Sequence, residues 1–176
     1  GKMGSPAQLN AIYEQALTNP ATRPAALSAL VTAGPRAKPT GDLSRVAGLL
    51  DQPQGAHLAG IWRVEKAKPA LITLAKAPGT DEALRLGSLM GLAAFGDRKA
   101  LSDIAGSNQP ARQRRQAIQL LVPLDPAAAA ELAVRLLTDP AAEPETEAVV
   151  GAFLLHKGGP SALTSALEGQ SIPPTV

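Results

Sequence analysis

Cysteine is absent from this chain of 176 residues, which also has only two histidines and four aromatic side chains. Without cysteine the chain can form no disulfide, thiolate zinc site, iron–sulfur cluster or thiol nucleophile. The two histidines, His57 and His156, are almost a hundred residues apart, and neither has a flanking carboxylate at ligand spacing. We therefore expect no cofactor in this domain, neither haem nor a divalent metal ion.

Aromatic residues make up 2% of the sequence and hydrophobic residues 45%, so the core must consist of Ala, Leu, Ile and Val. Such small side chains suit closely spaced helices. No apolar run approaches the ~18 residues that span a bilayer, and we expect no membrane insertion by this segment. Residues 1–5 do not resemble a signal peptide and are interpreted as a tag or linker.

The most regular feature of the sequence is a glycine that recurs every 62 residues, at Gly34, Gly96 and Gly158. Each of these glycines closes a stretch of alanine and leucine typical of a helix. The interval corresponds to two repeats of about 31 residues. The pattern predicts an all-α stack of helical hairpins, an α-α superhelix or solenoid, with the three glycines at its structural turns. We expect Gly96 and Gly158 to adopt the left-handed conformation of a helix cap.

Leucines keep a fixed distance from these glycines. Leu30, Leu92 and Leu154 each precede a glycine by four residues, and Leu101 and Leu163 each follow one by five. We expect all five to face the core, the first three on the last turn of a helix and the other two where the next helix begins.

Proline and glycine divide the chain into about five helical hairpins and one unpaired helix, with no strand signal. The expected pairs are 6–18 with 23–33, 41 or 42–50 with 54–66, 69–77 with 81–95, 98–105 with 110–121, and 126–137 with 143–156, and the unpaired helix is 160–168. Ser5 and Thr80 are the expected N-caps of two of these helices. The repeat domain thus covers 6–168, and 169–176 is interpreted as a tail leading to a missing further repeat of a longer protein.

Two stretches carry a resemblance to known proteins. Residues 94–101, Ala-Phe-Gly-Asp-Arg-Lys-Ala-Leu, resemble the joint between helices in HEAT-like repeats of the PBS-lyase type. Residues 153–163 and 169–173 resemble the repeat region of large exported bacterial proteins, in which a dehydrogenase-like β-propeller precedes the repeats and a c-type haem domain ends the chain. The resemblance implies a periplasmic or extracytoplasmic location. Because Cys-x-x-Cys-His is absent, any haem of such a parent must be attached elsewhere.

Basic residues supply the candidate partner surface. Arg112, Arg114 and Arg115 form the densest basic cluster, and their guanidinium groups can bind phosphates or carboxylates. The other interpretation is the solvated face of a helix. Trp62 has cations nearby and could stack on a partner or a base, but its spacing from Leu58 and Ile61 favours a place in the core.

Two other motifs have a structural interpretation beside a chemical one. Glu143, Glu145 and Glu147 stand at alternate positions, which on a helix spreads them around the axis, so they indicate an acidic helix start and not a catalytic pair. Residues 157–161, Lys-Gly-Gly-Pro-Ser, could hold an anion at a helix N-terminus. They lack the full phosphate-loop pattern, and an inter-repeat turn is the favoured interpretation.

Charge is divided along the chain. Residues 1–122 hold 15 Lys and Arg against 8 Asp and Glu, a net +7, whereas residues 123–176 hold 2 against 7, a net −5. A charge of +7 over 122 residues is weak beside the basic faces of dedicated nucleic-acid proteins.

These patterns favour a non-catalytic scaffold that holds flanking domains, or another protein, at a fixed separation. The alternative is a nucleic-acid-binding domain, since some HEAT-like proteins are DNA glycosylases. The modest net charge makes nucleic acid the less favoured partner, and a salt-dependent DNA titration separates the two hypotheses.

Overall fold

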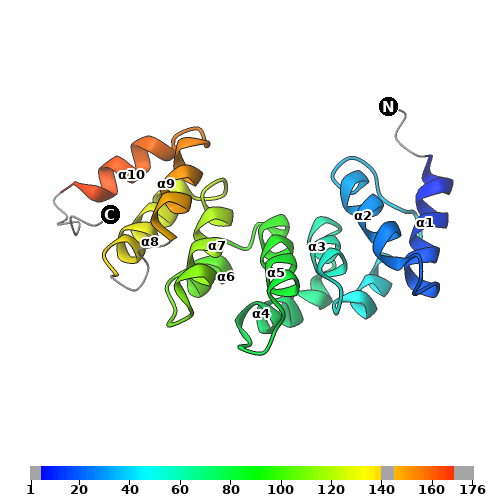
Figure 1. The fold of residues 1–176 in the computed structure, drawn as a ribbon. Helices are drawn as coiled ribbons and strands as arrows, with labels where there is room; N and C mark the ends of the chain where they lie inside the picture. Colours follow the sequence, from blue (N-terminus) through cyan, green and yellow to red (C-terminus); the bar gives the residue numbers. More distant parts are fainter. Residues whose placement is uncertain (1–4, 140–144, 169–176) are drawn as a thin grey trace. The chain divides into compact units, whose positions relative to one another are not determined.

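The computed structural model describes residues 5–139 and 145–168, and over these ranges it is all-α, without a strand (Figure 1). The predicted all-α class is confirmed. The chain divides into two compact units, an N-terminal unit of residues 1–95 and a C-terminal unit of residues 96–176. The predicted tail, 169–176, and residues 1–4 of the predicted linker lie outside the described residues.

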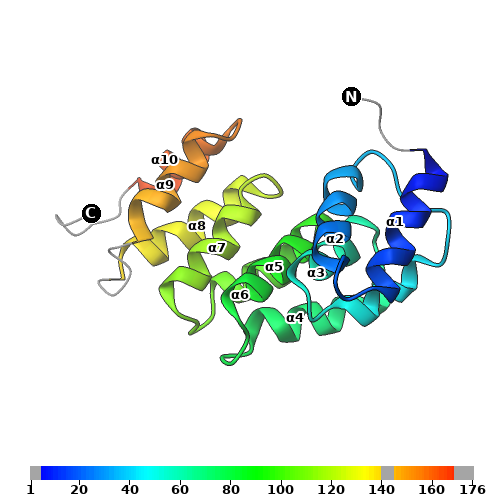
Figure 2. The ribbon, with the colours of Figure 1, turned by 45° about the vertical axis from the view of Figure 1, so that its right-hand side comes forward.

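The N-terminal unit packs its elements in consecutive pairs (Figure 2). α1 packs on α2, the 3₁₀ helix η1 on α3, and α4 on α5, while α2 and α5 both contact α3. The elements are α1 (Pro6–Thr18), α2 (Arg23–Ala33), η1 (Leu43–Leu49), α3 (Pro53–Ile61), the 3₁₀ turn η2 (Glu65–Ala67), α4 (Lys68–Lys76) and α5 (Glu82–Phe95).

The start of α1 follows its local sequence. The backbone N–H of Gln8 donates to Ser5 Oγ at 3.3 Å, and the backbone N–H of Ser5 donates to Gln8 Oε1 at 2.7 Å. This reciprocal capping box satisfies two backbone donors at the end of the helix, and Pro6 fits the first helical position. The predicted cap at Ser5 is confirmed.

The predicted helix 54–66 is wrong in its second half, because α3 ends at Ile61. Arg63 has a φ of 54°, the left-handed conformation that closes many helices. Its N–H donates to the Gly60 carbonyl at 3.0 Å, and the N–H of Val64 donates to the Ala59 carbonyl at 2.9 Å. This is a Schellman motif with arginine where glycine is usual, so no glycine marks it in the sequence.

Two further predictions need correction. Residues 43–49 form a 3₁₀ helix in place of the expected α-helix, with Val46 and Leu49 buried. The cap of α5 is Asp81 and not Thr80, since Asp81 Oδ1 accepts from the backbone N–H of Ala83 at 2.9 Å and of Leu84 at 3.3 Å.

Glycines let the backbones of α3 and α5 approach each other closely. A methyl group at Gly60 would lie 2.0 Å from the carbonyl oxygen of Gly91. One at Gly91 would lie 2.5 Å from the carbonyl oxygen of Ala56, and one at Gly87 would lie 2.3 Å from that of Pro53. No side chain fits at these three positions, so this contact sets the spacing of the two helices.

The C-terminal unit places α7, α9 and α10 around α8. Its helices are α6 (Arg98–Ala105), α7 (Ala111–Leu121), α8 (Pro126–Leu137), α9 (Thr146–Leu154) and α10 (Gly159–Leu167). Consecutive members of the predicted pairs, α6 with α7 and α8 with α9, contact each other, and α10 packs on α8 and α9. The first turn of the predicted helix 143–156 falls partly on residues outside those described.

The leucine prediction holds at four of its five positions. Leu30, Leu92, Leu101 and Leu163 are buried, but Leu154 is 65% exposed, and its neighbour Leu155 is 92% exposed. α9 ends at Leu154, so this side chain lies at the edge of the packed helices and not on an inward turn.

The three periodic glycines serve different purposes. Gly96 and Gly158 have φ values of 74° and 81°, which confirms the expected left-handed conformation. Gly34 ends α2 with a φ of −50°, ordinary helical backbone. At Gly34 a larger side chain would be crowded, because a methyl group there would lie 2.9 Å from Ile61 Cγ2.

Replacing Gly60 by Ala should destabilise the protein by at least about 2 kcal/mol, because the methyl group must push α3 away from α5. Gly151→Ala is the matched control, since Gly151 also lies within a helix but has nothing within 4 Å of the new methyl group. It should stabilise by about 0.5–1 kcal/mol through helix propensity. Urea denaturation followed by circular dichroism measures both, and equal effects of the two substitutions would contradict the close contact.

Candidate functional site

The surface of the N-terminal unit includes an apolar hollow of about 320 Å³ lined by residues of three helices. The lining residues are Val31 from α2, Pro53, Gln54 and His57 from α3, and Ala83, Leu86, Gly87 and Met90 from α5. We call this set the α2–α3–α5 hollow.

The close packing of α3 and α5 makes the floor of the hollow. Gly87 is buried beneath it and carries no side chain to fill the space. Of the side chains that line the hollow, Leu86 is 37% exposed, and those of His57 and Met90 are half-buried. A concave apolar surface of this kind can accept an apolar side chain of a ligand or another protein.

The hollow is uncharged at neutral pH. α3 contains no Asp, Glu, Lys or Arg, and in α5 the charged residues are Glu82 and Arg85, in its first two turns. The guanidinium group of Arg85 donates to the carbonyls of Ala77 and Thr80, so it is engaged with the loop before α5. The central part of a protein–protein interface typically contains few charged residues.

His57 is the one titratable group among the residues that line the hollow. Burial lowers the pKa of His57 below its ordinary value of 6.5. Neither α2 nor α5 contributes a charged side chain to the lining that would offset this effect. His57 is therefore uncharged where it lines the hollow at pH 7.

The arginine cluster is not the free surface that the sequence suggested. Arg114 Nη1 lies 2.9 Å from Asp139 Oδ2, and Arg115 pairs with Glu145 and also donates to Gln119 Oε1 at 2.6 Å. The side chains of both arginines are only 16% exposed. These ion pairs hold α7 against the end of α8 and the start of α9, whereas Arg112 is exposed.

Trp62 is a core residue, 6% exposed, and so is not a stacking platform for a base. Its ring meets that of Tyr13 edge-to-face, with centroids 5.1 Å apart and an angle of 84°. The hydroxyl of Tyr13 lies 3.2 Å from the Asp42 carbonyl, and burial raises the pKa of Tyr13 to about 12. Trp62 Nε1 is buried without a hydrogen-bond partner in the described part of the chain.

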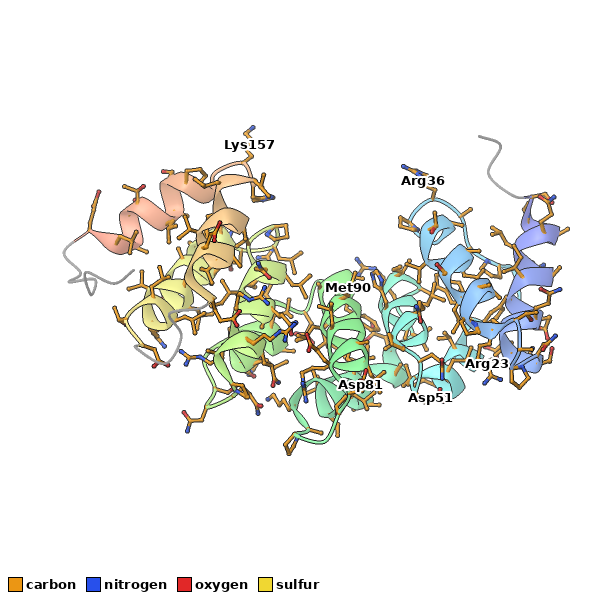
Figure 3. The ribbon with its side chains drawn as sticks, viewed as in Figure 1. Arg23, Arg36, Asp51, Asp81, Met90 and Lys157 are labelled. Carbon is orange, nitrogen blue, oxygen red and sulfur yellow. The ribbon has the colours of Figure 1, made fainter. Side chains whose placement is uncertain are left out.

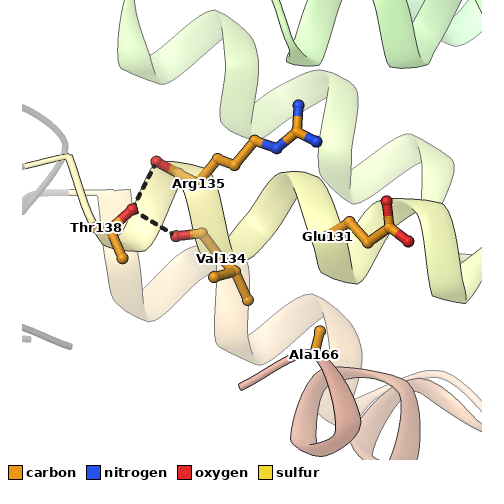
Figure 4. Close-up of a pocket in the computed structure, with 5 residues that line it drawn as sticks. All are labelled: Glu131, Val134, Arg135, Thr138 and Ala166. Carbon is orange, nitrogen blue, oxygen red and sulfur yellow. Dashed lines mark hydrogen bonds between the residues drawn. The ribbon is translucent and has the colours of Figure 1, made fainter. Parts of the chain in front are cut away.

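The surface between α8 and α10 is more polar than the α2–α3–α5 hollow (Figure 4). A shallow hollow of about 420 Å³ is lined by Glu131, Val134, Arg135, Thr138 and Ala166. The Thr138 hydroxyl donates to the carbonyl of Val134 at 3.0 Å, so it is engaged with its own helix.

A neighbouring hollow of about 640 Å³ contains Gly158 and Ser161 of the motif 157–161, for which anion binding was the alternative interpretation. Asp125 and Glu131 line the same hollow, and their negative charge opposes an anion there. The turn interpretation of residues 157–161 is the one that agrees with this surface, since Gly158 is the left-handed N-cap residue immediately before α10.

The structure describes two of the three glutamates of the acidic run. Glu145 pairs with Arg115, Glu147 is exposed, and Glu143 lies outside the described residues. Across 5–139 and 145–168, no three His, Asp or Glu side chains come together as a metal site. In the same ranges no helix combines the length and the apolar character needed to cross a membrane.

Sequence reasoning missed the α2–α3–α5 hollow, because its residues come from three separate helices. Two signals were available in the sequence. Gly87 and Gly91 are four residues apart, which puts two bare positions on one face of a helix. In addition, none of the nine residues of α3 is Asp, Glu, Lys or Arg.

We expect Arg115→Ala to destabilise the protein by about 1–3 kcal/mol, because it leaves Glu145 partly buried without its cation. Arg98→Ala is the control, since Arg98 is an exposed residue at the start of α6. Its effect should stay within about 0.5 kcal/mol. Thermal unfolding at 50 mM salt measures both, and an equally small effect at Arg115 would show that the pair does not stabilise the unit.

The lowered pKa of His57 makes stability depend on pH. As pH falls below about 6.5 the unfolded chain binds a proton before the folded chain does, so stability is lost on acidification. His57→Gln should therefore reduce the drop in melting temperature between pH 7.5 and pH 5. Gln54→Leu is the control, because it changes a non-titrating residue of the same hollow, and its melting temperature should fall between pH 7.5 and pH 5 by as much as that of the unmodified chain. An equally large fall in His57→Gln would contradict the role of His57 in the pH dependence.

Comparison with known proteins adds no relative: no family model, no curated protein and no solved structure matches this chain.

Proposed function

We propose that this chain is a non-catalytic helical-repeat scaffold, a spacer and protein-interaction domain of a larger protein. The observation that carries the proposal is the α2–α3–α5 hollow, an uncharged concave surface supported by a close contact between two helix backbones. The partner in this proposal is a protein, either a flanking domain of the same parent or another chain.

The proposed mechanism is geometric. Paired helices stacked as HEAT-like repeats form an α-α superhelix that holds its neighbours at a fixed distance. The resemblance of residues 94–101 and 153–163 supports this arrangement, and with it a parent that is an exported bacterial protein with a β-propeller and a c-type haem domain. In this proposal the haem belongs to the parent and not to this domain.

Nucleic-acid binding is the competing function, and the engaged arginines count against it. Arg114 and Arg115 are the centre of the densest basic cluster, and both already face carboxylates. A phosphate backbone would have to displace Asp139 and Glu145 to reach them. An enzymatic role has no support in the hollow, where His57 has no acid, base or nucleophile beside it.

Two measurements on the intact chain test the proposal. A displayed library of random helical peptides should yield binders that are lost in Leu86→Glu and kept in Leu155→Glu, a matched change at an exposed leucine of the other unit. A labelled DNA duplex titrated at 50 and 200 mM salt should bind only weakly. Tight duplex binding that weakens by about a thousandfold between these salt concentrations, with no peptide recovered, would replace the scaffold by the nucleic-acid function.

A further inference from the structure

The periodicity of α3 places His57 on the wall of the α2–α3–α5 hollow. Pro53, Gln54 and His57 stand at positions i, i+1 and i+4, so they share one face of the helix, and all three line the hollow. The His57 side chain is half-buried in the free chain. An apolar side chain that fills the hollow must therefore cover the part of the ring that still faces water.

The two protonation states of His57 differ in what such burial costs. The neutral imidazole carries no charge, whereas an imidazolium that is covered loses its hydration and needs a counter-ion in exchange. No residue that lines the hollow is Asp or Glu. In the described part of the chain, the ion pairs are formed by Arg45, Lys99, Arg114 and Arg115 and not by His57. A protonated His57 would thus be buried without compensation.

The charged side chains of the surrounding helices do not supply a counter-ion. α3 contacts α2, α4, α5 and η1. None of the charged residues on these four elements lines the hollow, and they are Arg23, Arg45, Lys68, Lys76, Glu82 and Arg85. Five of the six are basic and would oppose a further positive charge, and Glu82 is exposed in the first turn of α5.

Two exposed aspartates, Asp51 and Asp81, precede α3 and α5 (Figure 3). Asp81 accepts from backbone N–H groups at the start of α5, and Asp51 lines a different hollow. Met90, which lines the α2–α3–α5 hollow, lies further along α5 in the same view. Burial lowers the pKa of His57, and neither aspartate contributes to that shift.

We propose that the α2–α3–α5 hollow is a pH-dependent binding site, which holds an uncharged apolar segment of a partner protein tightly while His57 is neutral and weakly once His57 is protonated. The partner and the proton compete, because covering the ring with apolar surface favours its neutral form. This inference rests on the proposed scaffold function and specifies how binding at the same hollow is regulated.

Linkage gives the direction and the size of the effect. Covering His57 lowers its pKa further, so binding releases a proton wherever the free chain is protonated. Above the pKa of His57 in the free chain, which lies below 6.5, the affinity for the partner is independent of pH. Below that pKa the affinity falls by at most about tenfold per pH unit, because a single proton is released.

A peptide without titratable groups tests the inference on the intact chain. A displayed library of helical peptides composed only of Ala, Leu, Met, Gln and Ser supplies the probe, and its tightest binder is made with acetylated and amidated ends. Calorimetry should show binding at pH 5 at least about threefold weaker than at pH 7.5. At pH 5 the heat of binding should also depend on the ionisation enthalpy of the buffer, which reports the released proton.

The two histidines of the chain provide a matched pair of variants. His57→Gln should bind the peptide with the same affinity at pH 5 as at pH 7.5, whatever that affinity is, and should release no proton. His156→Gln changes the histidine of the C-terminal unit and should keep the full difference between the two pH values. Circular dichroism at both pH values verifies that each variant is folded.

The inference is overturned if the unmodified chain binds the peptide equally at the two pH values, or if His57→Gln keeps the difference. Failure of the scaffold proposal looks different. If random helical peptides bind and no uncharged peptide does, the scaffold function stands and this inference is wrong. If neither library yields a binder, both are wrong.

Discussion

The contact between the backbones of α3 and α5 is the constraint on which the rest of the N-terminal unit depends. Gly60, Gly87 and Gly91 each lie against a backbone carbonyl of the facing helix, so the two helices approach more closely than side chains would allow. The buried alanines and leucines around them complete a core that needs few aromatic residues. The same bare backbone leaves an unfilled space above Gly87. One structural device thus fixes the helix spacing and creates the hollow.

In the C-terminal unit, ion pairs between side chains help to fix how the helices lie against one another. Two arginines of α7 reach carboxylates that lie 25 and 30 residues further along the chain, and both pairs are largely shielded from water. Such pairs contribute specificity of geometry more than net free energy, because burying the ions costs much of what their attraction returns. Two charges of α7 are thus engaged in holding α7, α8 and α9 together. In the N-terminal unit, by contrast, the α2–α3–α5 hollow is lined without Asp, Glu, Lys or Arg.

Helices whose ends are set by nearby residues were predicted correctly from the sequence. Features that depend on contacts distant in the sequence, or on an unusual residue at a helix end, were not. The bounds of α1, α2, α6 and α8 agree with the residues that cap and begin them. α3 was predicted too long because Arg63 takes the left-handed position that glycine usually marks. The partners of Arg114 and Arg115 could not be predicted, since nothing local connects them to Asp139 and Glu145. Leu154 was expected inside by its spacing from Gly158, but burial depends on which helix lies opposite.

The composition also constrains how a surface of this chain can recognise anything. Four aromatic residues are present, and none lines the hollow. Interfaces usually concentrate their binding energy in large side chains that enter pockets of the other partner. In the proposed scaffold function this chain contributes the concave surface, so the large anchoring side chains would have to come from the partner. The hollow above Gly87 would then receive such an anchor, and affinity would depend on how well an uncharged side chain fills its volume of about 320 Å³.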